Sequence, residues 1–482
     1  MDATPFPRSL RRAAGLAGFA AVAVLPALAW ASETAPHLDG RDLGPLWVVP
    51  FAGILLSIAV MPLVAPHIWH HHFGKIAAGW GLAFLVPFAA TFGPGLALYE
   101  VLHVALLEYI PFIVLLTALF TVAGGVRLKG ALVGTPVANT TGLALGTALA
   151  SVMGTTGAAM LLIRPLLRAN AHRRYKVHTV VFFIFLVANI GGSLTPLGDP
   201  PLFLGFLKGV SFFWPTQHLL KPMLLVAGLL LAVYFALDLV LYAREDAGPP
   251  PLSEGTSEPL GIEGGINLLL LAAVVVAVLL SGVWHPGVAL PVFGVGVPLE
   301  SLTSQVLLIG ITIASLRLTS ARSRALNGFT WGPMVEVAKL FAAIFLTIIP
   351  AIAILKAGTE GALGIVIAAV NHDGQPVPAA YFWATGILSS FLDNAPTYLI
   401  FFNTAGGDAA RLMGDLAVTL TAISAGAVFM GANTYIGNAP NFMVKAIAEE
   451  RGVTMPSFFG YMLWSCGLLV PSFAIVTLVF FL

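Results

Sequence analysis

Three short polar segments interrupt long apolar stretches of the sequence, and they carry the residues best suited to chemistry. They read Asp199-Pro200-Pro201, Asn394-Ala395-Pro396 and Asn438-Ala439-Pro440. Asp and Asn accept hydrogen bonds from the free N–H groups at a helix N-terminus, and proline in the first turn has no N–H to leave unpaired. Each segment therefore predicts a half-helix that starts inside an apolar region, with Asp199, Asn394 or Asn438 as its cap.

Two helix ends are predicted just before these caps. Ile190-Gly191-Gly192 and Met430-Gly431-Ala432 would each end a preceding half-helix. The last carbonyl oxygens of a helix have no partner within it. We therefore expect free carbonyl oxygens close to the caps, where oxygen ligands around a gap in apolar surroundings suit a small hard cation.

Asp199 and Asp393 are the two acids at these breaks. An ionisable group inside a membrane costs about 3 kcal/mol or more, so it is a functional candidate by default. Burial favours the neutral form of a carboxyl, whereas a bound cation or nearby N–H groups favour the charged form. Both acids are therefore predicted to hold a proton or an alkali metal ion in turn. The alternative is that each only neutralises a helix dipole.

Neutral oxygen atoms near the breaks could complete a coordination shell, although each taken singly is better explained by backbone bonding within a helix. Ser389 and Ser390 offer two such hydroxyls. We expect no catalytic residue and no cofactor, and Na⁺ and H⁺ as the ions that the site exchanges. The predicted cation and proton site comprises Asp199, Asp393, Asn394, Asn438, Ser193, Thr195, Asn433, Thr434, Thr155 and Thr156.

The elements that must position these residues are membrane spans. Only 9% of the residues are charged and 58% are hydrophobic, whereas soluble domains carry about 25% charged residues. At about 20 residues per helix, the apolar sequence suffices for roughly ten to twelve spans. The net charge of +1 gives no basic surface for nucleic acid, and the single Cys466 excludes an intrachain disulfide. We therefore expect an all-α polytopic membrane protein that contacts membrane lipid and binds no nucleic acid.

Ten full spans and two re-entrant hairpins can be placed along the chain. The hairpins cover 131–168 and 378–410, and each has a polar break near its middle, at Gly154-Thr155-Thr156-Gly157 and at Asp393-Asn394-Ala395-Pro396. The spans are predicted at about 46–64, 76–92, 108–126, 177–208, 219–242, 264–282, 302–318, 333–356, 414–448 and 457–481.

The N-terminal segment and the basic residues predict the orientation. Residues 1–31 are typical of a secretory signal peptide, with three arginines, an apolar stretch and then Ala29-Trp30-Ala31; an uncleaved anchor helix is the alternative. Either way the mature N-terminus would lie in the periplasm, outside a bacterial inner membrane. Most Lys and Arg residues then fall in predicted cytoplasmic loops, as orientation rules require. The first hairpin is flanked by bases and should enter from the cytoplasm, and the second from the other side.

The two halves of the sequence resemble each other. Thr195 and Asp199 align with Thr434 and Asn438 at an offset of 239 residues, and Thr155 aligns with Asp393 at 238. Each half would hold five full spans, and this odd number inverts the second half relative to the first, as alternating access requires. The predicted domains are a first inverted repeat at 45–243, a cytoplasmic linker at 244–263 and a second repeat at 264–482.

At Asn189 to Pro201 and Leu392 to Thr397 the chain resembles the ion-transporter superfamily. It is most similar to the NhaD-like sodium/proton antiporters and to a neighbouring group named as citrate transporters. The resemblance covers about 45–482 in layout and implies a homodimer of scaffold and transport domains with an elevator-like motion. It also implies that hairpin tips and unwound helices form the site. The chain departs from the antiporters at Gly154-Thr155-Thr156, where they tend to carry acids.

Two functions follow as hypotheses. The first is a secondary active transporter that exchanges Na⁺ (or Li⁺) for H⁺ by alternating access, because two acids lie at matching breaks. The alternative is a cation-coupled citrate or dicarboxylate carrier, because helix N-termini also suit anions; the absence of Arg and Lys near the breaks weakens it. An enzyme is not expected, since no His-Glu-x-x-His, Gly-x-Ser-x-Gly or Gly-x-x-x-x-Gly-Lys motif is present.

Overall fold

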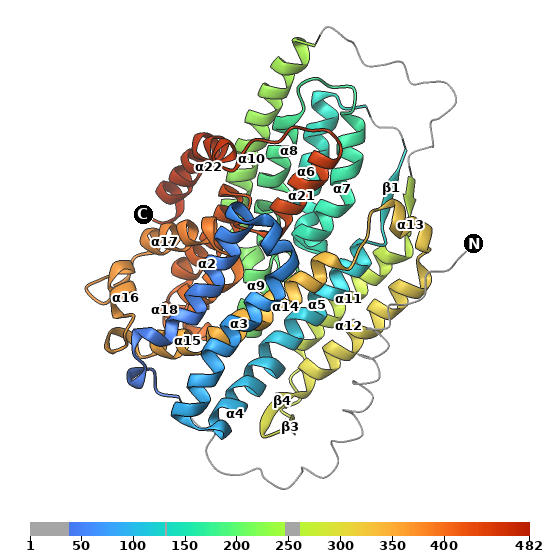
Figure 1. The fold of residues 1–482 in the computed structure, drawn as a ribbon. Coiled ribbons are helices and arrows are strands. Elements are labelled where there is room, and N and C mark those ends of the chain that lie inside the picture. Colours follow the sequence, from blue (N-terminus) through green and yellow to red (C-terminus); the bar gives the residue numbers. More distant parts are fainter. Residues whose placement is uncertain (1–37, 131–132, 246–260) are drawn as a thin grey trace.

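A computed structural model of the chain describes residues 38–130, 133–245 and 261–482. The predicted signal peptide at 1–31 lies outside the described residues, and so does most of the predicted linker, at 246–260. The described part of the chain is mainly helical, with three short two-stranded sheets. Figure 1 shows the helices running side by side through the molecule.

Long apolar helices occupy the positions at which spans are predicted. Eight described helices are long and apolar enough to cross a membrane, and a bent pair at 332–356 makes a ninth span. The position predicted at 414–448 holds a shorter apolar helix, followed by a further helix. The all-α polytopic fold class is therefore confirmed. Two boundaries were wrong: the second and third spans begin earlier, at Pro66 and Pro94, because proline readily occupies the first turn of a helix.

The helices of the first and middle parts of the chain form an outer layer. Within it, α5 packs against α11 and α12, and α14 packs against α3. Strands β1 and β2 are antiparallel, with Arg127 opposite Glu263, and join the start of the layer to its middle. Its elements are η1 (Gly40–Asp42), η2 (Pro45–Val48), α2 (Val49–Val64), α3 (Pro66–Phe92), α4 (Pro94–Val104), the π-helical turn η3 (Ala105–Tyr109), α5 (Ile110–Ala123), β1 (Arg127–Lys129), β2 (Gly261–Glu263), α11 (Ile266–Val283), β3 (Ala289–Val292), β4 (Val295–Pro298), α12 (Leu299–Leu318), α13 (Ala321–Leu326), α14 (Gly332–Thr347), α15 (Ile349–Lys356), η5 (Gly358–Glu360), α16 (Gly364–Val370), β5 (Asn371–His372) and β6 (Gln375–Pro376).

Two helical hairpins stand at the predicted places. The first consists of α6 (Pro136–Met153) and α7 (Thr155–Ala169), and the second of α17 (Pro378–Phe391) and α18 (Asn394–Thr404). Gly154 alone separates α6 from α7, and its φ of +81° favours glycine. In Figure 1 the first hairpin lies toward the upper end and the second toward the lower left, so they approach the middle from different ends.

Two broken spans face these hairpins. The first runs from α8 (Val177–Leu186) through η4 (Ile190–Leu194) to α9 (Pro200–Leu207), and the second from α20 (Ala417–Met430) through η6 (Gly431–Asn433) to α21 (Ala439–Glu450). Each broken span also contacts the hairpin of the other half, since α9 packs against α18 and α21 packs against α7. The remaining elements are α10 (Trp214–Ala243), α19 (Ala409–Met413) and α22 (Phe458–Phe480).

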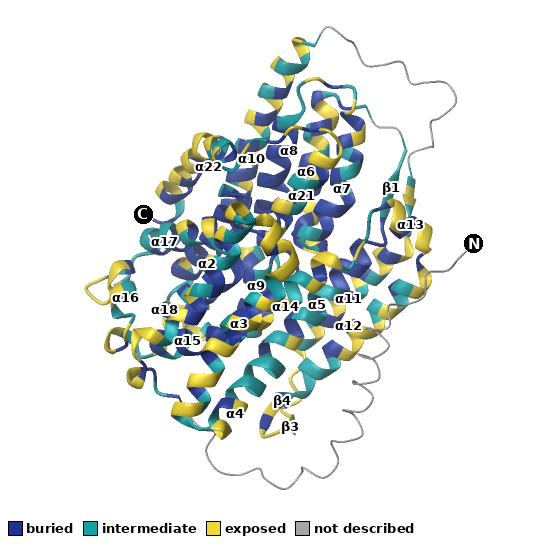
Figure 2. Ribbon diagram, viewed as in Figure 1, coloured by how far each residue is buried: buried dark blue, intermediate teal, exposed yellow. Residues whose placement is uncertain are grey.

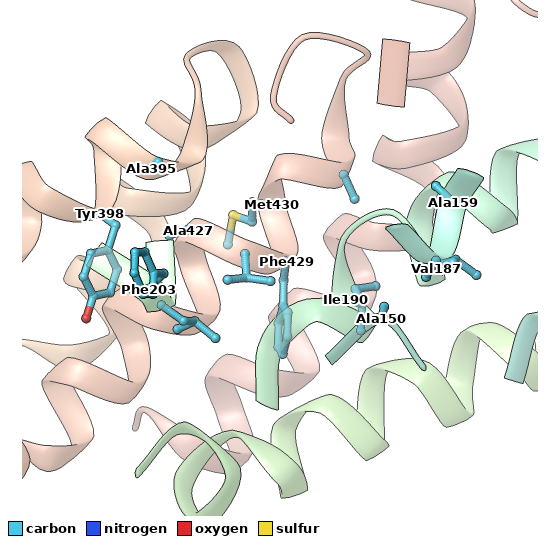
Figure 3. Close-up of a cluster of buried hydrophobic side chains, with 14 of the residues drawn as sticks. Ala150, Ala159, Val187, Ile190, Phe203, Ala395, Tyr398, Ala427, Phe429 and Met430 are labelled. Atoms are coloured by element: carbon cyan, nitrogen blue, oxygen red, sulfur yellow. The ribbon is translucent and has the colours of Figure 1, made fainter. Parts of the chain in front are cut away.

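The broken spans lie at the centre of the molecule. In the first, over Val177–Leu194, 89% of the residues are buried, whereas 17% are buried in the most apolar 18 residues of α12 in the outer layer. Figure 2 shows this gradient from dark blue inner helices to yellow outer faces. Apolar side chains from both halves fill the space around the breaks (Figure 3). Those from the first half include Val187, Ile190 and Phe203, and those from the second include Ala395, Tyr398, Phe429 and Met430.

Matched contacts support the predicted repeat, which stays a prediction in its inverted form. Ser151 donates to the carbonyl oxygen of Gly191, and Ser390 donates to that of Met430. Thr195 donates to the Ser151 carbonyl, and Thr434 to the Ser390 carbonyl. The corresponding residues differ by 239 in each case, the offset of the motif. Hairpin and broken span are therefore joined in the same way twice.

Candidate functional site

Asp199 is held by side chains from both halves of the chain. It is 2% exposed and immediately precedes α9. Its Oδ1 accepts from Thr155 Oγ1 at 2.9 Å and from Asn438 Nδ2 at 3.1 Å. Its Oδ2 accepts a short bond from Asn394 Nδ2. Four of the predicted site residues, from two hairpin tips and two broken spans, thus meet at one carboxylate.

Asp393 has a different environment, although it lies beside Asn394. It is partly exposed, and its Oδ1 accepts from the N–H of Ala395 at 3.0 Å. That is the one hydrogen bond to its side chain within the described chain. Asn394 is fully buried, and its Oδ1 has no hydrogen-bond partner among the described residues. The second hairpin therefore presents one lightly bonded carboxylate and one unused amide oxygen.

The predicted caps are corrected by this geometry. Asp393, not Asn394, caps α18, and Asn394 is its first residue. Asp199 and Asn438 stand at N-cap positions, but neither side chain caps its helix. Pro200 and Pro201 have no N–H at the first two helical positions, and the N–H of Leu202 at the third donates to the backbone carbonyl of Asp199 at 3.1 Å. Its side chain instead turns to the donors of the opposite half.

Both acids line one cavity. It has a volume of about 110 Å³ and lies between the breaks and the outer helices α5 and α14. Thr155, Thr156 and Asn438 add polar groups, whereas the α5 and α14 walls are apolar. Within the described residues, no Lys, Arg or His lines it. The cavity is therefore a mainly apolar chamber with its polar groups gathered at the ends of half-helices.

The carbonyl oxygens of Gly191, Met430 and Gly431, which were expected to be free, are hydrogen-bonded. Gly191 O accepts from Ser151, Met430 O from Ser390, and Gly431 O from Asn441 Nδ2 at 2.8 Å. Unpaired backbone groups are costly where water is absent, so polar side chains take the place of the missing helical turns. Each of these three carbonyl oxygens therefore keeps one lone pair at most for a ligand, whereas Asn394 Oδ1 has no hydrogen bond among the described residues.

The other predicted site residues mostly bind the backbone. Ser193 donates to Ile190 O at 2.8 Å, and Thr195 and Thr434 join their broken spans to hairpin residues Ser151 and Ser390. Asn433 donates to Ser390 Oγ at 2.9 Å, and its Oδ1 has no partner among the described residues. None of the four lines the central cavity. Their assignment as ligands stays a prediction.

Sequence reasoning missed two residues of the same network. Asn189 Nδ2 donates to Asn441 Oδ1 at 2.7 Å, and Asn189 Oδ1 accepts from Asn438 Nδ2 at 3.2 Å. Asn441 also donates to Thr434 O at 2.9 Å. These amides connect the two broken spans directly. The available signal was an asparagine within each apolar run, at Asn189 before the glycines and at Asn441 after the cap.

Comparison with known proteins places this architecture in a family. No curated protein matches the chain. A family model described as "Putative citrate transport" matches residues 40–481, which include both hairpins and both broken spans. The chain therefore belongs to the family described as "Putative citrate transport", as a multi-pass membrane protein of transporter type.

Proposed function

We propose that the protein is a secondary active transporter that carries citrate or a related carboxylate together with a cation, either H⁺ or Na⁺. The observation that carries this proposal is the single cavity lined by Asp199, Asp393 and the starts of half-helices. Such a chamber offers partial positive charge to an anion and negative charge to a cation. The family match over residues 40–481 supports the choice of citrate.

The anion would bind at the start of α7. Thr156 and Gly157 line the cavity and belong to the first turn of that helix. N–H groups in a first turn have no carbonyl partner within the helix, so they can donate to a carboxylate. The Thr156 hydroxyl can add a further donor. These groups replace the basic side chains that the described cavity lining does not contain.

The coupling cation would bind at the second hairpin. Asp393 has a single donor to its side chain among the described residues, and Asn394 Oδ1 has none. Carboxylate and amide oxygens are common ligands of hard cations. A proton on Asp393 would serve the same purpose, because it also removes the negative charge that opposes a bound anion. Coupling then follows, since the anion binds well only when Asp393 is neutralised.

Exchange of Na⁺ (or Li⁺) for H⁺ is the second candidate, favoured by the cavity lining itself. Two acids and no base among its described residues suit a cation better than a free anion. In this mechanism Na⁺ and H⁺ would compete for Asp393, with Asp199 holding the site together. The two candidates differ in whether citrate is required for ion movement.

The test uses the purified chain in sealed vesicles. Uptake of labelled citrate is measured under an imposed Na⁺ or H⁺ gradient, and an acid-sensing dye reports proton movement in the same vesicles. Citrate accumulation that needs a gradient in the wild type, and that no longer responds to the gradient in Asp393→Asn, supports the first proposal. Na⁺-driven proton movement without citrate would replace it by antiport. Absence of both in vesicles that contain folded protein would overturn both.

We also propose an orientation, an oligomeric state and a cellular location. We propose a homodimer in a bacterial inner membrane, with the mature N-terminus in the periplasm. The basic residues support this orientation, since β1 contains Arg127 and Lys129, and Arg168 lines a pocket with Lys129. Figure 1 shows β1 at the end away from α4. Single cysteines placed at each end, labelled by an impermeant reagent in intact cells, would test it.

A further inference from the structure

A small basic pocket lies beside strand β1. It shares no lining residue with the central cavity. Its volume is about 20 Å³, and four arginines contribute to its walls. They come from β1, from α7 and from the turn after α21, and Leu326 and Asn327 at the end of α13 complete the lining. The lining residues are Arg127, Leu128, Arg164, Pro165, Arg168, Leu326, Asn327 and Arg451.

Arg164 is the central member of this group. Its Nη1 is buried and has no hydrogen-bond partner among the described residues. The loop after α13 presses on the same guanidinium, since a Cβ at Gly328 would lie 2.2 Å from Nη2. Gly328 also has a φ of +66°, so glycine suits both the backbone and the contact. The side chain is therefore held in place with one donor unused.

Arg164 forms no ion pair within the described residues. Arg127 donates to Glu263 at 2.9 Å, and Arg168 donates to the Leu128 carbonyl at 3.0 Å. Arg451 is exposed and forms no ion pair within the described residues. The exposed Glu450 precedes it and attracts Arg164 electrostatically, so it offsets part of the charge, although it forms no ion pair within the described residues. The partly buried charge of Arg164 is costly unless an anion joins it.

An adjoining pocket extends the site. It has a volume of about 300 Å³ and shares Leu128, Pro165 and Arg168 with the small basic pocket. Its other walls combine the base Lys129 with Ile262 and glycine backbone. The small basic pocket and the larger, partly apolar pocket beside it together fit a molecule with an anionic group and a less polar part. Arginine guanidinium groups match phosphate oxygens especially well.

We propose that these two pockets bind the phosphate group of an acidic phospholipid, with Arg164 and Arg451 as its main contacts. Inorganic phosphate shares the same chemistry for the smaller pocket alone. A lipid bound there would join α7, which begins at Thr155, to β1 and α13 of the outer layer. This binding is independent of the identity of the transported substrate, because it can be measured without transport.

The experiment measures lipid retention by the full-length protein in detergent, using native mass spectrometry. Phosphatidylglycerol, phosphatidylcholine and inorganic phosphate are titrated separately against the wild type and three variants. We expect phosphatidylglycerol to bind better than phosphatidylcholine, and both Arg164→Gln and Arg451→Gln to weaken its binding about fivefold, the usual contribution of one base near a membrane surface. Arg317→Gln is the matched control, since Arg317 is exposed and lines neither pocket.

Competition identifies the source of the phosphate. Displacement of phosphatidylglycerol by millimolar inorganic phosphate would assign the smaller pocket to free phosphate and overturn the lipid assignment. Equal binding of the two lipids would overturn it as well. An equal loss in Arg317→Gln would show a general charge effect and overturn the site. Arg451 is exposed, so its variant keeps the test valid if Arg164→Gln does not fold.

Discussion

The two hairpin tips meet the same cavity with different chemistry. The first brings the Thr155 hydroxyl and leaves the acid, Asp199, to its neighbouring broken span. The second carries its own acid, Asp393, while the broken span at the matching place supplies the amide of Asn438. Each half thus contributes one carboxylate, but from a different element.

The surroundings of the two carboxylates differ more than their positions. Asp199 is 2% exposed and accepts from three side chains, of which two belong to the other half. Asp393 is partly exposed and accepts one backbone N–H of its own helix. A carboxylate held by many donors stabilises the assembly, whereas a lightly held one can exchange its ligand. We therefore expect Asp199 to hold the halves together and Asp393 to carry the exchanged cation or proton.

The largest expected effect comes from removing the better-bonded acid. Asp199→Ala should lower the free energy of unfolding by about 3 kcal/mol, because Thr155, Asn394 and Asn438 each lose a partner for a buried donor. Asp393→Ala removes one backbone contact and should cost less than about 1 kcal/mol. Thermal unfolding in detergent measures both. Equal stability of the two variants would contradict the difference drawn between these acids.

Asp393→Asn should separate transport from stability. The amide oxygen can still accept from Ala395, so the melting temperature should change little, but neither a proton nor a cation can be exchanged. We expect gradient-driven accumulation of citrate, or ion exchange if that is the activity, to fall about 100-fold, because one exchanged charge is worth at least about 3 kcal/mol inside a membrane. Full transport in this variant would assign the exchange to another group.

A charge exchange between the matched positions tests their equivalence. Asn438→Asp alone places a second carboxylate next to Asp199, where the present contact is 3.1 Å, and like charges at such a distance disfavour each other. Combining it with Asp199→Asn restores one charge at nearly the same place. The double variant should therefore be more stable than Asn438→Asp. If the stability loss of the double variant equals the sum of the losses of the two single variants, the two positions do not interact.

The hydroxyls of the first hairpin tip should give the smallest effect. Thr155→Val removes the 2.9 Å hydrogen bond to Asp199 and should cost about 1 kcal/mol of stability. Thr156→Val is a matched change at a neighbour that forms no hydrogen bond to this carboxylate among the described residues, so its stability should stay within about 0.5 kcal/mol. The pair is compared by thermal unfolding. A larger loss for Thr156→Val would place the important hydroxyl one residue later.

Much of the architecture was predictable because it depends on local composition. Apolar runs marked the spans, and Asp or Asn followed by Pro marked the starts of α9, α18 and α21. The hairpin break at Gly154 was predictable from its polar neighbours. Predictions that depended on the direction of side chains were less successful. The side chains of Asp199 and Asn438 do not cap their helices, and the carbonyl oxygens expected to be free are bonded to Ser151, Ser390 and Asn441.

The sequence by itself determined that the chain spans a membrane, where its helices break and which two acids lie at the breaks. Apolar length and helix-terminus chemistry act over a few residues, so they are legible along the chain. Only the tertiary structure decided that Thr155, Asn394 and Asn438 converge on Asp199 while Asp393 faces the cavity. Side-chain direction depends on which donors the opposite half brings within about 3 Å, and contacts between residues 195 and 239 positions apart leave no local pattern.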